Sequence, residues 1–248
     1  MLTPFVLDPN EKPLDRLVDG YSFTSIFRRI AFIGDSLSSG EFETRDKDGK
    51  PGYHDFYEYS WGQYIARKNA LTAYNFSKGG MRCDWYLDSF ANERDLWNPE
   101  KACQAYVIAL GVNDVFNAGT DIPTYIKNYE TIVNRYKEIS PDAKFFFVTI
   151  PRDVHRSEQM QARTVQVAEA LNALAERTEN AYIIDLFKYA PVFDADVRDR
   201  YFLYGHMSPA GYLMFAQLVD SYIDYIVRHN YRDFKQVGFI GSGIAYKF

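Results

Sequence analysis

The stretch IAFIGDSLS, residues 30–38, decides the fold. Its four apolar residues, Ile30 to Ile33, end abruptly at Gly34, and Asp35 and Ser36 follow. A short apolar run bounded by a glycine is typical of a strand that is buried on both faces. Further runs of this kind lie near residues 71–76 and at 105–110, 144–150 and 181–184. The sequence therefore predicts five buried strands.

Helical patterns separate these strands. Between residues 122 and 136, apolar side chains recur every three or four positions, and Pro123 follows Asp121 as at a helix start. Residues 160–177 are rich in good helix formers. Ser208 and Pro209 predict the N-terminus of a last long helix. Alternating strands and helices favour a parallel sheet covered on both faces. We expect an α/β protein, a three-layer α/β/α sandwich, with one domain over residues 1–248.

Two segments depart from this alternation. Residues 41–60 are polar and aromatic and contain glycine, so we expect a long loop over the C-terminal edge of the sheet that serves as a lid. The tail, residues 234–248, is apolar and punctuated by glycines. It has three roles open to it: to add an edge strand, to wrap the body, or to contact the second subunit of a homodimer.

Composition excludes several classes of protein. The net charge of −5 over 248 residues argues against a broad nucleic-acid-binding surface. The two cysteines, Cys83 and Cys103, are too few for a disulfide framework, and we expect free, buried thiols. Residues 1–17 carry acidic residues and prolines where a signal peptide needs a basic start and an apolar run. No stretch has the roughly 18 apolar residues of a membrane span. We therefore expect a cytoplasmic protein with no membrane partner.

Four candidate catalytic residues follow predicted strands or precede the last helix. Ser36 follows the first strand, Gly80 the second and Asn113 the third, whereas His206 comes just before the last helix. The carboxyl ends of the strands form the ligand crevice of an open α/β sheet, so these residues converge there. An imidazole can take the proton of a serine hydroxyl, and backbone and amide N–H groups can stabilise the oxyanion that its attack creates.

These residues lie in blocks that resemble the SGNH/GDSL hydrolase family. The blocks are the G-D-S-L string at Ser36, the N-x-x-x-G-G turn at Gly80, the G-x-N-D string at Asn113 and a late histidine, His206. They occur in the family's order. The resemblance implies a flavodoxin-like five-stranded sheet in the order 2-1-3-4-5, and it makes Ser36 the nucleophile, Gly80 and Asn113 oxyanion donors, and His206 the base. It implies no metal and no cofactor.

The sequence departs from the family at one position. Three residues before the histidine, where the family usually has an aspartate that orients the imidazole, this chain has Leu203. A backbone carbonyl or another acid, such as Asp199, could fill that role, or nothing does. We prefer a Ser36–His206 dyad with no carboxylate, which predicts a lower pKa for His206 than in a full triad.

Other polar residues have weaker claims on the site. His54 and His155 are rival bases. Arg82, Arg152 and His155 are candidate substrate-binding residues, although Arg82 could equally be a solvated surface charge. Asp35 and Asp114 are interpreted as turn-holding residues that accept backbone hydrogen bonds.

The sequence therefore predicts a serine esterase that acts on a small-molecule ester, such as an O-acetylated carbohydrate, through an acyl-enzyme. A thioesterase or an acyltransferase would use the same residues. A non-catalytic binding protein on the same fold is the alternative that Leu203 favours. A nucleotide-binding protein is a more distant alternative, because the turn after the first strand lacks a glycine-rich phosphate cradle.

Overall fold

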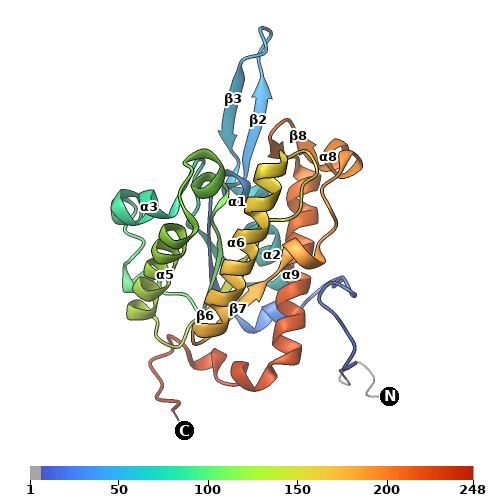
Figure 1. Cartoon of the computed structure of the whole chain (residues 1–248). Coiled ribbons are helices and arrows are strands. Elements are labelled where there is room, and N and C mark those ends of the chain that lie inside the picture. The colour runs from blue at the N-terminus through green and yellow to red at the C-terminus, as the bar shows by residue number, and fades with distance from the viewer. Residues whose placement is uncertain (1–6, 248) are drawn as a thin grey trace.

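A five-stranded parallel sheet forms the centre of the computed structural model, which describes residues 7–247 (Figure 1). The strands are β1 (Arg29–Gly34), β4 (Thr72–Asn75), β5 (Ala105–Ala109), β6 (Lys144–Val148) and β7 (Ala181–Ile184). Their order is β4-β1-β5-β6-β7, with every pair parallel, which is the order 2-1-3-4-5. The predicted strands and their order are confirmed. Residues 1–6 and Phe248 lie outside the described residues, and so do the parts of the N-terminal and tail predictions that fall on them.

Helices cover both faces of the sheet. One hydrophobic cluster joins the sheet to α2 (Trp61–Asn69) and α9 (Pro209–His229). The other joins it to α5 (Ile122–Ile139), α6 (Glu158–Arg177) and the residues 81–97. Since the strands are apolar on both faces, each face needs its own layer of helices. The three-layer sandwich is confirmed.

The long helices begin where the sequence places their caps. The Asp121 side chain accepts a hydrogen bond from the backbone N–H of Thr124, and α5 follows with Pro123 in its first turn. The Ser208 side chain accepts from the N–H of Gly211, and α9 begins at Pro209. Side-chain oxygens thus satisfy N–H groups that a helix start leaves without partners.

Shorter elements fill the connections. The short α-helices are α1 (Ser36–Ser39), α3 (Cys83–Trp85), α4 (Ala91–Glu93), α7 (Leu186–Tyr189) and α8 (Ala195–Tyr201). The 3₁₀ turns are η2 (Phe23–Ile26), η3 (Tyr57–Tyr59), η5 (Pro99–Lys101), η7 (Tyr231–Phe234) and η8 (Val237–Phe239), and the π-helical turns are η4 (Tyr86–Phe90) and η6 (Asn113–Asn117). A two-stranded pairing joins β8 (Phe202–Leu203) to β9 (His206–Met207). Cys83 and Cys103 are free and buried, as predicted.

The segment 41–60 is a β-hairpin, so the expectation of a long loop is wrong. Its strands β2 (Glu41–Arg45) and β3 (Pro51–Asp55) pair antiparallel and stand out from the C-terminal edge of the sheet, beside β8 (Figure 1). Phe42 anchors the base of the hairpin, because its ring packs against those of Phe56, Tyr59 and Tyr212. The turn at the tip is closed by Asp46, which accepts backbone hydrogen bonds from Asp48 and Lys50.

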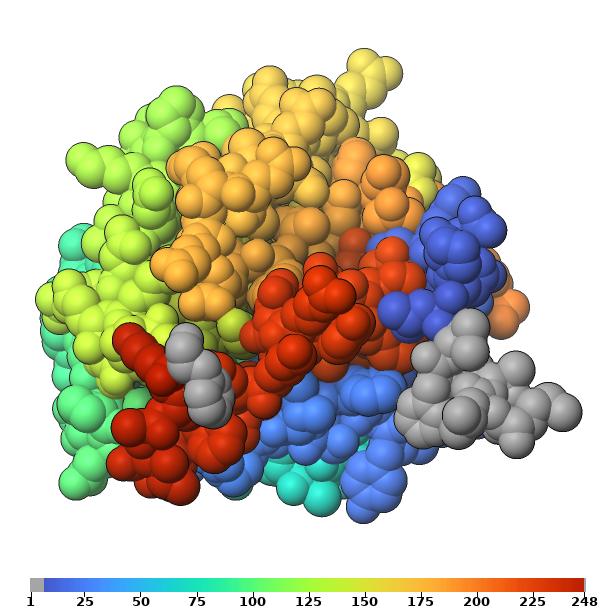
Figure 2. All heavy atoms as spheres, turned by 90° about the horizontal axis from the view of Figure 1, so that it is seen from below, coloured from blue at the N-terminus to red at the C-terminus, as the bar shows by residue number. Residues whose placement is uncertain are grey.

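The C-terminal tail wraps the body over its described residues. Phe234, Val237 and Ile240 are buried in the core. Arg28 donates to the carbonyl of Ile240, and Gln104 donates to that of Val237. Figure 2 shows the tail (red) lying across the underside of the molecule. Among the three roles that the sequence left open, wrapping is the one observed, and residues 234–247 form no edge strand.

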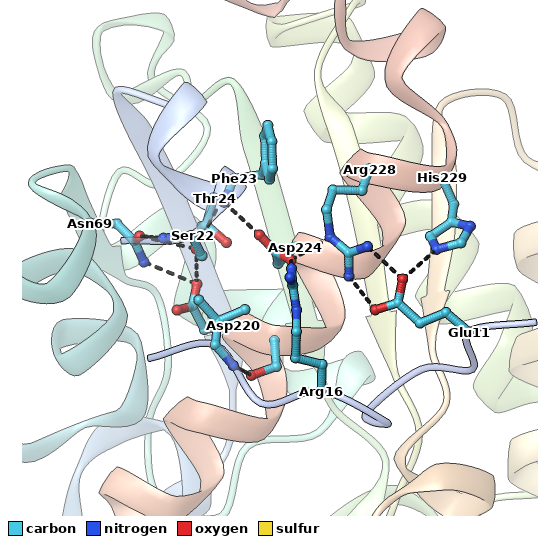
Figure 3. Close-up of polar contacts among 12 residues, drawn as sticks. Glu11, Arg16, Ser22, Phe23, Thr24, Asn69, Asp220, Asp224, Arg228 and His229 are labelled. Atoms are coloured by element: carbon cyan, nitrogen blue, oxygen red, sulfur yellow. Dashed lines mark hydrogen bonds and ion pairs between the residues drawn. The ribbon is translucent and has the colours of Figure 1, made fainter. Parts of the chain in front are cut away.

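A polar clamp holds the N-terminal segment against α9 (Figure 3). Glu11 accepts two hydrogen bonds from Arg228, at 2.6 and 2.7 Å, and contacts Nε2 of His229 at 3.1 Å. Further along, the hydroxyl of Ser22 donates to the fully buried carboxylate of Asp220 at 2.6 Å. These contacts fix the segment on the C-terminal half of α9. No helix within residues 7–247 combines the length and the apolar character needed to cross a membrane.

Candidate active site

Ser36 is the first residue of α1, and only Asp35 separates it from Gly34, where β1 ends. Asp35 caps this helix, and its Oδ1 accepts a hydrogen bond from the N–H of Leu37 at 2.9 Å. A Cβ at Gly34 would overlap the side chain of Ser38, so only glycine allows the strand to turn this sharply into the helix. The interpretation of Asp35 as a turn-holding residue is confirmed. Burial raises the pKa of Asp35 to about 7, although the hydrogen bond from Leu37 opposes the shift.

The turn that contains Gly80 lies beside the end of β1. The N–H of Lys78 donates to the carbonyl of Gly34 at 3.3 Å, which ties the turn to the strand that precedes Ser36. Gly80 has a φ of +73°, a left-handed conformation that glycine adopts readily. The backbone N–H groups of this turn are therefore held close to the start of α1.

Asn113 connects both of these segments. Its Nδ2 donates to Oδ2 of Asp35 at 3.3 Å and to the carbonyl of Met81 at 3.2 Å. One amide thus contacts the residue before Ser36 and the residue after Gly80. The neighbouring Asp114 is buried and accepts from the N–H of Cys83 at 2.9 Å, so its predicted role in holding a turn is also confirmed.

His206 lies in β9, at the entrance to α9 and against α1. Its Nδ1 is 3.0 Å from Oε2 of Glu43, and its Nε2 is 3.1 Å from Oε1 of Glu41. The ring of Tyr53 packs edge-on against the imidazole, with 5.5 Å between the ring centroids. Three residues of the β2–β3 hairpin therefore surround the histidine.

The expectation that no carboxylate reaches His206 is wrong. Leu203 pairs with His206 across β8 and β9, but its side chain is 44% exposed and apolar. Among the described residues, the carboxylates in contact with His206 are those of Glu41 and Glu43, and Asp199, in α8, is not one of them. The hairpin supplies the acid groups that the position of Leu203 lacks.

Glu43 is the more tightly held of the two glutamates. It is 5% exposed, and its Oε2 also accepts a hydrogen bond from the N–H of Gly205 at 2.8 Å, while its Oε1 pairs with Arg45. Burial acts to raise the pKa of Glu43, but its bonds to His206 and Gly205 and the charge of Arg45 outweigh burial and lower it. Glu43 is therefore a carboxylate at neutral pH.

The two glutamates also act on the histidine. Burial acts to lower the pKa of His206, but the hydrogen bonds and charges of Glu41 and Glu43 together raise it above its ordinary value. The dyad hypothesis had predicted a pKa lower than in a full triad, on the premise that no carboxylate reaches the ring, and that premise is wrong. The hydrogen bonds of the described residues include none between Ser36 Oγ and His206, because Nε2 faces Glu41.

Sequence reasoning missed Glu43 because it lies 163 positions before its partner, inside a segment interpreted as a loop. A signal was present. Glu41 and Glu43 alternate with Phe42, and the glycine-containing stretch DKDGK follows them. Alternation before such a turn is typical of a hairpin strand, which places both glutamates on one face.

A cavity of about 310 Å³ lies next to this site. Its wall includes Leu37 and Ser38, which follow the candidate nucleophile, and Gly205 and Met207, which flank His206. The rest of the lining is mostly apolar, with polar side chains from Asp35, Thr149, Asp153, His155, Arg156 and Arg198. Arg198 and Asp153 form an ion pair at 3.1 Å. Arg156 and Arg198 were missed, because nothing in their sequence surroundings separates them from surface arginines.

The structure places one of the three predicted substrate-binding residues at this cavity. His155 lines it. Arg82 instead forms an ion pair with Asp84 at 2.9 Å, and Arg152 lies over the ring of Phe187 beside a different depression. His54, the other rival base, contacts Thr44 across the hairpin. Residues 7–247 contain no group of three or more His, Cys, Asp and Glu side chains that could hold a metal ion.

The fold and the site define a class: a three-layer α/β/α sandwich with its candidate reactive groups at the carboxyl ends of parallel strands. A family model described as the GDSL-like lipase/acylhydrolase family matches residues 32–214. The chain belongs to this family, and it is therefore an acylhydrolase, an enzyme of a family that acts on esters.

Solved structures share the fold. A carbohydrate esterase family 2 enzyme with a carbohydrate-binding domain, from Corynascus thermopiles (Myceliophthora fergusii), superimposes with a TM-score of 0.63 at 16% identity, over 81% of this chain and 66% of that one. A family two carbohydrate esterase from Clostridium thermocellum, in complex with cellohexaose, gives 0.62 at 17% identity, over 87% and 67%.

A lipase/acylhydrolase from Enterococcus faecalis gives a TM-score of 0.57 at 21% identity, over 82% of this chain and 96% of that chain. The chain thus spans about two thirds of the length of the two carbohydrate esterases and nearly all of the bacterial acylhydrolase. At these identities the likeness shows a common fold. No curated protein sequence matches the chain.

Proposed function

We propose that this protein is a serine esterase in which Ser36 is the nucleophile and His206 the base. Ser36 Oγ attacks the ester carbonyl carbon while its proton passes to Nε2 of His206. The tetrahedral intermediate collapses as the imidazolium gives this proton to the leaving alcohol, and an acyl-Ser36 remains. Water, deprotonated by the same nitrogen, then releases the carboxylic acid and restores Ser36.

The single observation that carries this proposal is the position of Asn113. Its amide contacts Asp35, directly before Ser36, and Met81, directly after Gly80. The amide thus joins the segments that carry Ser36 and Gly80, which supports an oxyanion hole between them. The N–H groups of Ser36 and Gly80 and the side chain of Asn113 are the proposed donors.

The proposed substrate is a small-molecule acyl ester, such as an O-acetylated carbohydrate. The cavity, which the chain neighbours of Ser36 and His206 line, has a volume of about 310 Å³ and mostly apolar walls, so a short acyl group fits it. On the outer side of the site, the ring of Tyr53 packs against His206 and the residue is 55% exposed. Tyr204, two positions before His206 in the chain, is 57% exposed. Exposed aromatic rings of this kind can stack on a sugar. Two of the similar structures are described as carbohydrate esterases, which supports the same substrate class.

The alternative functions have less support than a serine esterase. A thioesterase or an acyltransferase would use the same residues, and the acceptor of the acyl group decides between them. The non-catalytic binding protein was favoured by Leu203 and the loss of an acid. The contact between His206 and Glu43 removes that reason, because a carboxylate is present at the histidine.

Hydrolysis assays on two serine variants test the proposal. Ser36→Ala is expected to fold normally and to lose nearly all hydrolysis of p-nitrophenyl acetate and of an acetylated xylo-oligosaccharide. Ser39→Ala is the matched control, because Ser39 lies on the same short helix and its hydroxyl is bonded to Asp55 instead. It is expected to keep most of the activity. Wild-type turnover by Ser36→Ala would contradict the assignment.

A further inference from the structure

Two glutamates of one strand contact the two nitrogens of one histidine. Glu41 and Glu43 are separated by one residue in β2, so their side chains lie on the same face of the hairpin. Glu43 contacts Nδ1 of His206 at 3.0 Å and Glu41 contacts Nε2 at 3.1 Å. A carboxylate accepts hydrogen bonds, so a ring nitrogen that pairs with an ionised glutamate carries a proton. A ring paired with two ionised glutamates is an imidazolium, which cannot act as a base.

The contact with Glu43 suits catalysis. Three groups, the N–H of Gly205, Nδ1 of His206 and the guanidinium of Arg45, hold its carboxylate in place. A fixed acceptor at Nδ1 keeps one proton there, which leaves Nε2 as the nitrogen that accepts a proton from serine. The same negative charge stabilises the imidazolium that forms during the reaction. Glu43 is thus a positioning residue, which acts through His206.

The contact with Glu41 opposes catalysis. It engages Nε2, the nitrogen that must accept the proton of Ser36. Its carboxylate also lies against the backbone of Gly79, where any Cβ would overlap it. It therefore lies between the histidine and the turn that carries Gly80. The backbone of Glu41 is held by the hydroxyl of Tyr212, which donates to its carbonyl at 2.7 Å, so withdrawal needs only a rotation of the side chain.

We propose that β2 controls His206 through two carboxylates with opposite effects: Glu43 positions the base, whereas Glu41 competes with Ser36 for Nε2 and holds the site at rest until substrate displaces it. This inference rests on the proposed function. When Glu41 withdraws, the proton on Nε2 passes to solvent. The ring keeps the proton on Nδ1, facing Glu43, and offers the lone pair of Nε2 to Ser36.

Other titratable groups surround the histidine. Arg45 pairs with Glu43, which in turn contacts the histidine, and β3 contributes the phenol of Tyr53. The start of α1 contributes the buried carboxyl of Asp35, and α9 contributes the hydroxyl of Tyr212, which bonds the carbonyls of Ser36 and Glu41. Of these groups, Glu43 hydrogen-bonds to Nδ1 of the ring, and Glu41 forms a 3.1 Å ion-pair contact with Nε2. Both raise the pKa of His206, so removal of either carboxylate lowers it.

The test compares Glu41→Gln and Glu43→Gln, with Glu58→Gln as the control because Glu58 is an exposed glutamate of the same segment. The readout is kcat/KM for p-nitrophenyl acetate from pH 4 to pH 9. We expect Glu41→Gln to move the acid limb to lower pH, with a gain there of about tenfold, the factor of one charge-assisted hydrogen bond, and an unchanged plateau. We expect Glu43→Gln to lower the plateau by up to about 10⁴. Glu43→Asp should regain part of that loss.

Two results would overturn the proposal. One is a Glu43→Gln variant with the wild-type plateau and pH profile. The other is a Glu41→Gln variant that is slower than wild type over the whole pH range, because Glu41 would then assist the reaction rather than compete with it. Thermal unfolding of each variant reports whether it is folded.

A second measurement separates this proposal from the proposed function. The ¹⁵N shifts of the His206 ring are followed against pH in the Ser36→Ala background, where no turnover is needed. Glu41→Gln is expected to change Nε2 and Glu43→Gln to change Nδ1, and each should lower the pKa of the ring. Shifts that neither variant alters would overturn the control by β2 even if Ser36 is the nucleophile. Full activity of Ser36→Ala would instead refute the proposed function.

Discussion

Oε2 of Glu43 lies 3.0 Å from Nδ1 of His206, although 163 positions separate the two residues in the chain. The acid at the histidine thus comes from a hairpin near the N-terminus and not from the residue three positions before the histidine, which is Leu203. The hairpin carries a tyrosine against the same ring and a second glutamate on its other nitrogen. A segment outside the four sequence blocks therefore surrounds the proposed base.

Asn113→Ala tests the oxyanion hole. The loss of this donor is expected to lower kcat by about 10²–10³, with a smaller effect on KM, because the amide stabilises charge that develops only in the transition state. Steady-state kinetics with p-nitrophenyl acetate measure both constants. Asn117→Ala is the matched control: Asn117 bonds Oδ1 of Asn113 at 2.6 Å from the exposed side, and its removal should cost far less. A change confined to KM would make Asn113 a substrate-binding residue.

Shortening the hairpin tip tests its role as a lid. Replacement of residues 46–50 by Asn-Gly keeps Arg45 paired with Pro51 and leaves Glu41 and Glu43 in place. We expect kcat/KM for an acetylated oligosaccharide to fall by about tenfold relative to p-nitrophenyl acetate, since the outer contacts with the alcohol are lost. An unchanged ratio between the two substrates would count against the lid.

Filling the cavity tests whether it holds the acyl group. Met160 lines the cavity and is only partly buried, so a larger side chain can enter there. Met160→Trp is expected to lower kcat/KM for a butyryl ester relative to an acetyl ester by about tenfold or more. Gln159→Trp, which alters the exposed neighbour, should leave the ratio as in wild type. Equal effects of the two variants would argue that the acyl chain lies elsewhere.

Glu11→Gln tests the clamp on α9. The hydrogen bonds from Arg228 lower the pKa of Glu11 from 4.5 to about 2, against the effect of burial. Because the folded-state pKa is the lower one, this stabilisation is fully present above pH 4.5 and is lost as pH falls towards 2. The variant should have an unfolding free energy about 1–3 kcal/mol below wild type at pH 7. The difference should shrink in acid.

Urea unfolding at pH 7 and pH 3 measures this difference. Glu138→Gln, at an exposed position of α5, is the control and should behave as wild type at both pH values. Esterase activity at pH 7 is expected to survive in Glu11→Gln, since the clamp lies at the other end of α9 from His206. A difference between Glu11→Gln and wild type that is equal at both pH values would contradict the linkage.

The sheet and its helices could be predicted from the sequence because local patterns determine them. The apolar run Ile30–Ile33 has the pattern of a strand buried on both faces. The caps at Asp121 and Ser208 define helix starts by short-range hydrogen bonds. The hairpin at 41–55 was missed because its first strand, β2, carries two glutamates, and charged residues of this kind usually indicate a solvated loop. Glu43 is buried only because His206, Gly205 and Arg45 are its partners.

The candidate site likewise contains residues that the sequence predicts and one that it does not. Ser36, Gly80, Asn113 and His206 could be named because each lies in a short block at a strand end or a helix start. Glu43 could not, because its contact with His206 depends on how a hairpin packs against β9, and no local pattern encodes that pairing. Of the two roles left open for Arg82, its ion pair with Asp84, two residues away, favours the surface charge.

Covalent labelling tests the central claim most directly. The wild-type protein and Ser36→Ala are treated with a p-nitrophenyl alkylphosphonate, digested and analysed by mass spectrometry. An activated serine attacks phosphorus, expels p-nitrophenolate and keeps the phosphonyl group. The account predicts one adduct, on the peptide that contains Ser36, and none on the variant. An adduct on another residue, or equal labelling of wild type and variant, would contradict it.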